Sequence, residues 1–188
     1  GYTLIVQPFF YIWIIEENKK NIFTKRTIIR SIMHSDAEFI LQLLNTDNWI
    51  RNIGDRGVRT IEDSKSYISK ILNTPNFEYN VIEKLNSKQP IGILSFIKRD
   101  PFDFPDFGFA LLPEFCNKGF AYETSIGYLK NLFSLNPNLK VIAICKNENA
   151  PSIKLLENLG FTYSSQVNEN LGEKLILYTI NKQHFGHK

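Results

Sequence analysis

One segment restricts the fold of this chain more than any other, because in it a strand is followed by a small-residue loop and a helix. We expect residues 106–112 to form the strand, Gly119 and Ala121 to lie in the loop, and the helix to begin there. Such a junction directs backbone N–H groups at a phosphate. The loop has neither the dinucleotide fingerprint nor the lysine spacing of a P-loop. An ordinary strand-to-helix turn therefore stays open as the alternative.

Size and composition favour one folded domain. The chain has 188 residues, of which 43% are hydrophobic and 13% aromatic, enough for a sizeable core. The net charge of +3 comes from lysines and arginines scattered among acidic residues. A nucleic-acid-binding protein gathers such residues on one face, so we expect no nucleic-acid partner.

The two cysteines, Cys116 and Cys145, have neither metal-ligand spacing nor the pattern of a disulfide framework. We therefore expect no bound metal and a cytoplasmic location. Cys145 ends the apolar run 141–145, which predicts a place in the core. Cys116 lies in the small-residue loop, but no histidine near it in the sequence supports a nucleophilic role.

Residues 4–15 are strongly apolar, but they fall short of the roughly 20 residues that a membrane-spanning helix needs. They also lack the preceding positive charge and the small-residue cleavage site of a signal peptide, so we expect no membrane partner. An added strand and a contact in a homodimer both stay open for this segment. The chain begins at Gly1 and its one methionine is Met33, so we expect a processed or truncated start.

Hydrophobic periodicity and turn residues predict a mixed α/β order along the chain. Two capping boxes, Ser35–Glu38 and Thr60–Asp63, predict helix starts, and Gly160 predicts a helix end. Strands are expected at 27–30, 77–83, 91–97, 106–111, 139–145, 161–167 and 174–180, and helices behind 35–38 and at 60–72, 119–133 and 149–158. This order implies one domain whose sheet has both parallel and antiparallel pairs.

A second segment, taken together with the loop, indicates a protein family. The run Asn149-Ala-Pro-Ser-Ile-Lys-Leu-Leu-Glu-Asn-Leu-Gly-Phe161, together with the loop, resembles the two signature segments of the GNAT N-acetyltransferase superfamily. The resemblance covers residues 23–182. It implies an α+β (α/β) fold in a single GNAT-like domain, with a mixed central sheet of splayed strands flanked by helices. We assign that domain to residues 22–183, with an extension at 1–21 and a tail at 184–188.

The loop departs from the family pattern at one position. Family loops usually read Gln/Arg-x-x-Gly-x-Gly/Ala, whereas this chain reads Cys116-Asn-Lys-Gly119-Phe-Ala121. Asn117 tolerates a left-handed backbone, so we expect the amide cradle to form with the loss of one side-chain contact. Two further segments, 24–30 and 49–60, look like the branch related to ribosomal-protein-alanine N-acetyltransferases.

The resemblance implies acetyl-coenzyme A as the co-substrate and assigns residues to it. The pantetheine arm would pair with the backbone of Leu111 and Leu112, and Asn149 would contact it besides capping a helix. The pyrophosphate would lie on the amides at the helix start. The residues expected around it are Asn117, Lys118, Gly119, Phe120 and Ala121.

Acetyl transfer to an amine needs few special groups, because the thioester is already activated. Ser152 occupies the family position beside the sulfur and is the candidate donor to the departing thiolate, with a local backbone contact as the alternative. Asp106 stands where many relatives have a glutamate and is the candidate base, with an ordinary loop role as the alternative.

The resemblance implies an amine as the acceptor, either a protein N-terminus or a small molecule. In this fold the loop 52–59 faces the acceptor, so Asp55 could pair with a cationic acceptor and Arg56 and Arg59 with an acidic one. A pairing of Asp55 with an arginine that fixes the loop stays equally open. Direct acetyl transfer is the leading function, and a non-catalytic acyl-CoA-binding module is the alternative.

Overall fold

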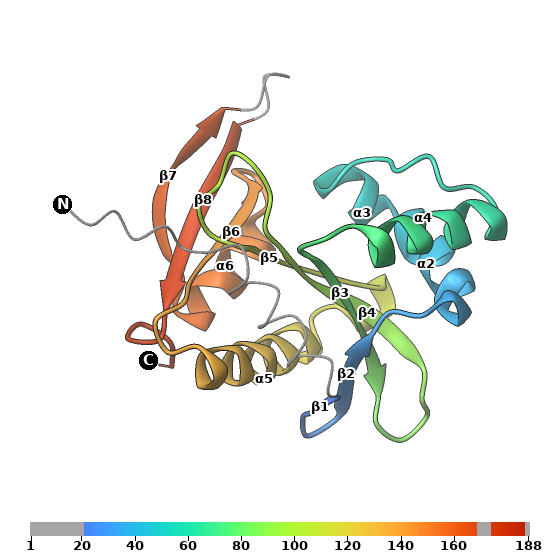
Figure 1. Ribbon diagram of the computed structural model, residues 1–188, viewed down its shortest axis with the longest axis horizontal. Coiled ribbons are helices and arrows are strands. Elements are labelled where there is room, and N and C mark those ends of the chain that lie inside the picture. The colour runs from blue at the N-terminus through green and yellow to red at the C-terminus, as the bar shows by residue number, and fades with distance from the viewer. Residues whose placement is uncertain (1–20, 169–173, 187–188) are drawn as a thin grey trace.

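The computed structural model describes residues 21–168 and 174–186 (Figure 1). The apolar segment 4–15 and most of the expected turn at 168–172 lie outside these ranges. One eight-stranded sheet runs through the described chain in the order β1-β2-β3-β4-β5-β6-β8-β7. The strands are β1 (Ile22–Phe23), β2 (Thr27–Ser31), β3 (Phe77–Lys84), β4 (Pro90–Ile97), β5 (Asp106–Leu111), β6 (Lys140–Lys146), β7 (Thr162–Asn168) and β8 (Lys174–Asn181).

The helices cover different parts of this sheet. They are α2 (Ala37–Leu44), α3 (Asp47–Asn52), α4 (Ile61–Asn73), α5 (Phe120–Leu135) and α6 (Ala150–Leu159), with 3-10 turns η1 (His34–Asp36) and η2 (Pro113–Phe115). Figure 1 shows α2, α3 and α4 beside β3 and β4, whereas α6 lies with β6, β7 and β8. One half of the molecule contains β1 to β5 with α2, α3 and α4, and the other contains β6 to β8 with α6. Helix α5 contacts β1, β2, β5 and α6, and so joins the two halves. No helix in the described ranges is both long and apolar enough to cross a membrane.

The expected strands and helices are confirmed, but one predicted capping box is wrong. Helix α2 begins at Ala37, and no side chain caps it. The Asp36 carboxylate instead accepts hydrogen bonds from the Met33 N–H (2.8 Å) and from the Arg30 guanidinium (2.8 Å), which explains why the chain turns there rather than at Ser35. The second box is confirmed, since Thr60 Oγ1 accepts from the Asp63 N–H at 3.1 Å and Asp63 Oδ2 from the Thr60 N–H at 2.9 Å.

Two short elements escaped the sequence analysis. Strand β1 has two residues, and α3 has six, too few for a hydrophobic period to emerge. Helix α3 begins where Thr46 Oγ1 accepts a hydrogen bond from the Trp49 N–H (3.2 Å). Its buried residue is Trp49, which anchors this short helix to the core.

Aromatic packing fixes α5 against the centre of the sheet. The Tyr128 ring on α5 lies 5.9 Å from the Phe107 ring on β5 and 6.2 Å from the Phe96 ring on β4, measured between centroids. Phe107 also stacks on Phe161, which follows α6. All four side chains are buried. Offset aromatic pairs of this kind stabilise a core by about 0.5–1.5 kcal/mol beyond their buried area, so they hold the middle of α5 against β5.

The sheet divides between β5 and β6. These parallel strands have one register pair, Asp106 with Ile142, and the Ile142 N–H donates to the Pro105 carbonyl at 2.9 Å. By contrast, β5 pairs with β4 over its whole length, and β6 pairs with β8 likewise. The two strands therefore separate beyond Asp106. We call the space between them the wedge, defined by residues 107–111 of β5 and 143–146 of β6.

Candidate active site

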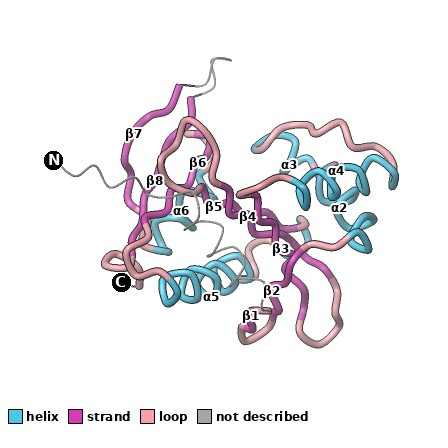
Figure 2. Tube along the Cα trace, viewed as in Figure 1, coloured by secondary structure: helices cyan, strands magenta, loops and turns pink. Residues whose placement is uncertain are grey.

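A cleft of about 1180 Å³ includes the wedge and continues between the two halves of the molecule. One end is lined by β5, β6, the start of α6 and the loop before α5. The other end is lined by α3, α4, the loop between them and the start of β3. The loops between α3 and α4 and between β4 and β5 are drawn pink in Figure 2, and both lie at the top of that view. We call the two parts the cofactor end and the acceptor end, after the roles that the family resemblance implies for them.

The loop before α5 has the backbone that an anion-binding turn needs. Asn117 has φ of 57° and Gly119 has φ of 79°, both left-handed, and the sequence analysis had noted that Asn117 tolerates this conformation. Gly119 is the N-cap residue of α5, and no side chain caps this helix. The first N–H groups of any α-helix have no intrahelical acceptor. The N–H groups of Phe120 and Ala121 therefore lie without an intrahelical partner beside the cleft, which Gly119 and Ala121 line.

Arg26, which the sequence analysis did not select, braces this loop. Its Nη1 donates to the Lys118 carbonyl at 3.0 Å, and its Nε donates to the Glu123 carboxylate at 2.6 Å. The guanidinium also lies over the Phe120 ring, 4.2 Å from the centroid. These contacts join the start of β2 to the first turn of α5. Arg26 thus fixes the loop through its carbonyl side and leaves the amide side facing the cleft.

Backbone groups of β5 face the wedge at alternate residues. The Leu112 N–H donates to the Ile91 carbonyl at 2.9 Å, so this group already has its partner on β4. Neighbouring residues of a strand direct their N–H and C=O groups to opposite edges. Leu111 and Phe109 therefore present their backbone groups to the wedge. Of the two residues predicted for the pantetheine arm, the structure places Leu111 on the open edge and Leu112 against β4.

Asn149 and Ser152 lie at the start of α6, on the β6 side of the wedge. Asn149 Oδ1 accepts a hydrogen bond from the Ser152 N–H at 3.3 Å, as expected of an N-cap residue. Capping uses the amide oxygen and leaves the Asn149 NH₂ group as a donor. Both side chains line the cleft, and that of Ser152 is half-buried. The predicted pair is thus brought to one place, opposite the backbone edge of β5.

Asp106 stands where β5 and β6 separate, at the junction of the two ends of the cleft. Its carboxylate accepts a hydrogen bond from Arg99 Nη2 at 2.9 Å and another from the Ile144 N–H. The side chain is 13% exposed. Burial raises the pKa of Asp106 above its ordinary value, although Arg99 and the Ile144 N–H oppose this shift. A carboxylate with a raised pKa accepts a proton more readily, as a base requires.

The acceptor end contains a pair of tyrosines that sequence reasoning also missed. Tyr67 on α4 and Tyr79 on β3 hydrogen-bond to each other, and both line the cleft. Burial raises the pKa of both hydroxyls, and the nearby positive charge of Arg56 offsets part of this rise. No sequence pattern joins residues on a helix and a strand, so only the fold could reveal this pair.

In the loop predicted to face the acceptor, two residues hold the loop together and a third lines the cleft. Asp55 and Arg59 form an ion pair with each other, and the Gly57 N–H donates to Asp55 Oδ1 at 2.8 Å. The Arg59 guanidinium, and then the Gly57 N–H, lower the pKa of Asp55 below its ordinary value. Arg59 also donates to Asn45 Oδ1 at 3.0 Å. These two residues fix the loop, as the alternative interpretation held, whereas Arg56 lines the cleft.

The two thiols at the cleft are free and protonated at neutral pH. Burial raises the pKa of Cys145 to about 11, and burial also raises that of Cys116. A thiol is nucleophilic as its thiolate, so neither residue is activated for covalent catalysis. Cys116 Sγ donates a weak hydrogen bond to the Leu112 carbonyl oxygen at 3.6 Å. Among the described residues, no group of histidine, cysteine and acidic side chains could hold a metal ion.

The fold and the cleft together define an acetyltransferase of the GNAT class, and comparison with known proteins agrees. The family model described as "Acetyltransferase (GNAT) domain" matches residues 26–162, so the chain belongs to this family of N-acetyltransferases. GNAT enzymes use acetyl-CoA.

Individual proteins resemble the chain in sequence or in fold. The chain is 28% identical over 140 residues to the uncharacterized N-acetyltransferase YnaD of Bacillus subtilis, covering 74% of this chain and 81% of YnaD. A GNAT-family acetyltransferase from Bacillus anthracis has the same fold, with a TM-score of 0.74 and 22% identity over 87% of this chain and 99% of that one. RimL, a ribosomal L7/L12 α-N-protein acetyltransferase solved with coenzyme A, gives a TM-score of 0.75 and 15% identity over 86% of this chain and 98% of RimL.

Proposed function

We propose that this N-acetyltransferase moves the acetyl group of acetyl-CoA directly to a primary amine, either a protein N-terminus or a small molecule. One observation carries the proposal. The wedge opens at Asp106 and leads to a left-handed Gly119 and the uncapped start of α5. A thioester arm fits between two separated strands, and its diphosphate fits an uncapped helix start. The catalytic domain in this proposal is residues 22–183.

The residues at the cofactor end suit acetyl-CoA. The amides of residues 118–121 would hold the diphosphate, with Asn117 shaping the loop. The backbone of Leu111 would pair with the pantetheine arm, joined by Phe109, and the Asn149 NH₂ group would donate to one of its carbonyl oxygens. This contact set is built mostly from backbone, which explains how the loop could retain its function with Cys116 in place of glutamine or arginine.

The chemistry needs one proton acceptor for the amine and one hydrogen-bond donor for the departing thiolate. The amine nitrogen attacks the thioester carbonyl carbon, a C–N bond forms, and the C–S bond breaks. Asp106 would take the proton that the amine loses, through a water molecule, and Ser152 would donate a hydrogen bond to the departing thiolate. A base of this kind contributes about two to four orders of magnitude in rate. Alignment of both substrates in one cleft supplies several further kcal/mol, about 7–11 in the best intramolecular cases.

The protonated thiols support direct transfer. A covalent acetyl-enzyme would require a thiolate at Cys116 or Cys145, and the raised pKa of each opposes that state. Initial rates measured over both substrates should therefore give intersecting double-reciprocal lines. Parallel lines, the sign of a covalent intermediate, would contradict direct transfer.

The direct test is the release of free coenzyme A thiol from acetyl-CoA with a panel of amines. We expect amine-dependent release. The alternative, a non-catalytic acyl-CoA-binding module, predicts thermal stabilisation by acetyl-CoA without thiol release for any amine. A cytosolic setting is part of the proposal, because a thiol product and two free cysteines suit a reducing compartment.

A further inference from the structure

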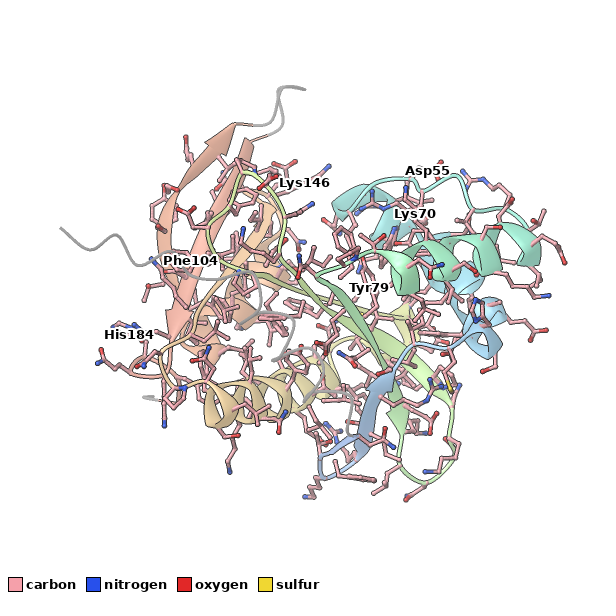
Figure 3. All side chains as sticks on the ribbon, viewed as in Figure 1. Asp55, Lys70, Tyr79, Phe104, Lys146 and His184 are labelled. Carbon is pink, nitrogen blue, oxygen red and sulfur yellow. The ribbon has the colours of Figure 1, made fainter. Side chains whose placement is uncertain are left out.

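Most of the charged side chains that line the cleft are basic. The charged residues that line the whole cleft are Arg56, Lys70, Arg99, Lys146 and Asp106. Within the described part of the chain, Asp106 is thus the acidic lining residue and the other four are basic. Figure 3 shows Lys70 and Tyr79 on the half that carries the acceptor end, with Lys146 on the opposite half.

The one acidic group is already compensated. Arg99 donates to Asp106 at 2.9 Å, so these two residues neutralise each other. Arg56 and Lys70 then remain, and no ion pair to either occurs in residues 21–168 and 174–186. The acidic residue nearest to Arg56 in the sequence, Asp55, is bound to Arg59 instead. The acceptor end therefore carries an uncompensated positive charge.

This positive charge lies near the pair Tyr67 and Tyr79. Arg56 lies close enough to influence the ionisation of both Tyr67 and Tyr79, and the charge of Arg99 also reaches Tyr79. Lys70 is on the same helix as Tyr67, three residues later, and so lies on the same face of α4. Arg56, Lys70 and the two hydroxyls thus surround one region of the cleft, beyond Asp106 from the wedge.

From this arrangement we infer that the acceptor is an amine that carries a carboxylate a few bonds from its nitrogen, bound by Arg56 and Lys70. The inference rests on the proposed function and names its substrate class. The amine would reach Asp106 while the carboxylate lies toward the basic pair. A polyamine would meet repulsion from two cations and find the single carboxylate already paired. Both an acidic peptide N-terminus and a free amino acid have this chemistry.

The experiment compares acceptors that differ mainly in charge. Thiol release is measured with three peptides that begin with alanine and continue with two glutamates, two glutamines or two lysines, and with free glutamate against its diamide. We expect kcat/KM to be highest for the acidic members by about tenfold over the neutral ones, equivalent to about 1.4 kcal/mol. A preference for the peptide identifies an acidic N-terminus, and a preference for glutamate identifies an amino acid.

Variants connect the preference to the basic pair. Arg56→Gln combined with Lys70→Gln should remove the acidic preference, and Lys65→Gln, an exposed residue of α4 outside the cleft lining, should keep it. Equal or higher kcat/KM for the neutral or lysine peptides in the parent protein would overturn the inference and leave the proposed function standing. An absence of thiol release with every acceptor would overturn both.

Discussion

The cofactor end and the acceptor end of one cleft are built in different ways. At the cofactor end, the groups that we propose for binding are backbone amides and carbonyls, held by regular elements and by the left-handed Asn117 and Gly119. At the acceptor end they are side chains from separate elements, including Tyr67, Tyr79 and Arg56. A backbone site tolerates substitutions that preserve the chain path, whereas a side-chain site changes with each replacement. In our proposal, the backbone site suits a co-substrate that relatives share, and the side-chain site can differ from one relative to the next.

The largest expected effect is the loss of acetyl-CoA binding in Gly119→Asp. Gly119 has φ of 79°, so any side chain is strained there, and a carboxylate would repel the diphosphate. We expect the thermal stabilisation by acetyl-CoA to disappear. Gly57→Asp is the matched control, since Gly57 has φ of 69° but lies outside the cleft lining. An undiminished stabilisation in Gly119→Asp would contradict the assignment of the cofactor end.

The next effect tests the junction between the two ends. Asp106→Asn keeps the shape of the side chain but removes its ability to take a proton. We expect kcat/KM to fall by about a hundredfold at a pH above the pKa of Asp106, where the parent holds the carboxylate that acts as the base, and the loss to shrink at lower pH. Because burial raises the pKa of Asp106, the parent's own activity should decline as the pH falls through that raised value. Parallel pH profiles for the variant and the parent would remove Asp106 from proton transfer.

A smaller effect is expected for Ser152→Ala at the cofactor end. The variant loses a donor to the thiolate but keeps the backbone N–H that Asn149 accepts. We expect kcat to fall by about tenfold, with little change in the dissociation constant of acetyl-CoA, because a hydrogen bond to a charged group contributes about 1.5–3 kcal/mol. Turnover measurements and calorimetry separate the two quantities. If turnover is unaltered, Ser152 serves the helix alone.

The smallest effect asks whether the backbone site also depends on a side-chain brace. Arg26→Ala removes the contacts to Lys118, Glu123 and Phe120. Since Arg26 is 40% exposed, we expect the dissociation constant of acetyl-CoA to rise only a few-fold. The dissociation constant of acetyl-pantetheine, which has no diphosphate, should stay the same. A matching rise for both ligands would show that Arg26 supports the fold and not the loop.

Local signals made most of the fold predictable from the sequence. The Thr60–Asp63 capping box, the C′ residue Gly160 and the small-residue loop each act within a few residues, so their outcomes could be inferred without tertiary information. The Ser35–Glu38 box failed because Arg30, on a neighbouring strand, binds Asp36 and fixes a different start. Helix α3 was missed because six residues give no period.

The candidate site could be predicted from the sequence only in part. The cofactor end is built from contiguous segments, and the sequence analysis had already named Gly119, Asn149 and Ser152, which line the cleft there. The acceptor end brings Tyr67, Tyr79 and Arg99 together from positions far apart in the chain, and no local pattern encodes that meeting. Arg26 reaches Glu123 across 97 positions of sequence, again beyond what a motif can indicate.

The most direct test of the account is a crystal structure of the protein with bound coenzyme A. We predict that the pantetheine arm lies between β5 and β6, paired with the backbone of Phe109 and Leu111, and that the diphosphate lies on the amides of residues 118–121. Coenzyme A bound elsewhere, with β5 and β6 joined past Asp106 and Ile142, would contradict the account.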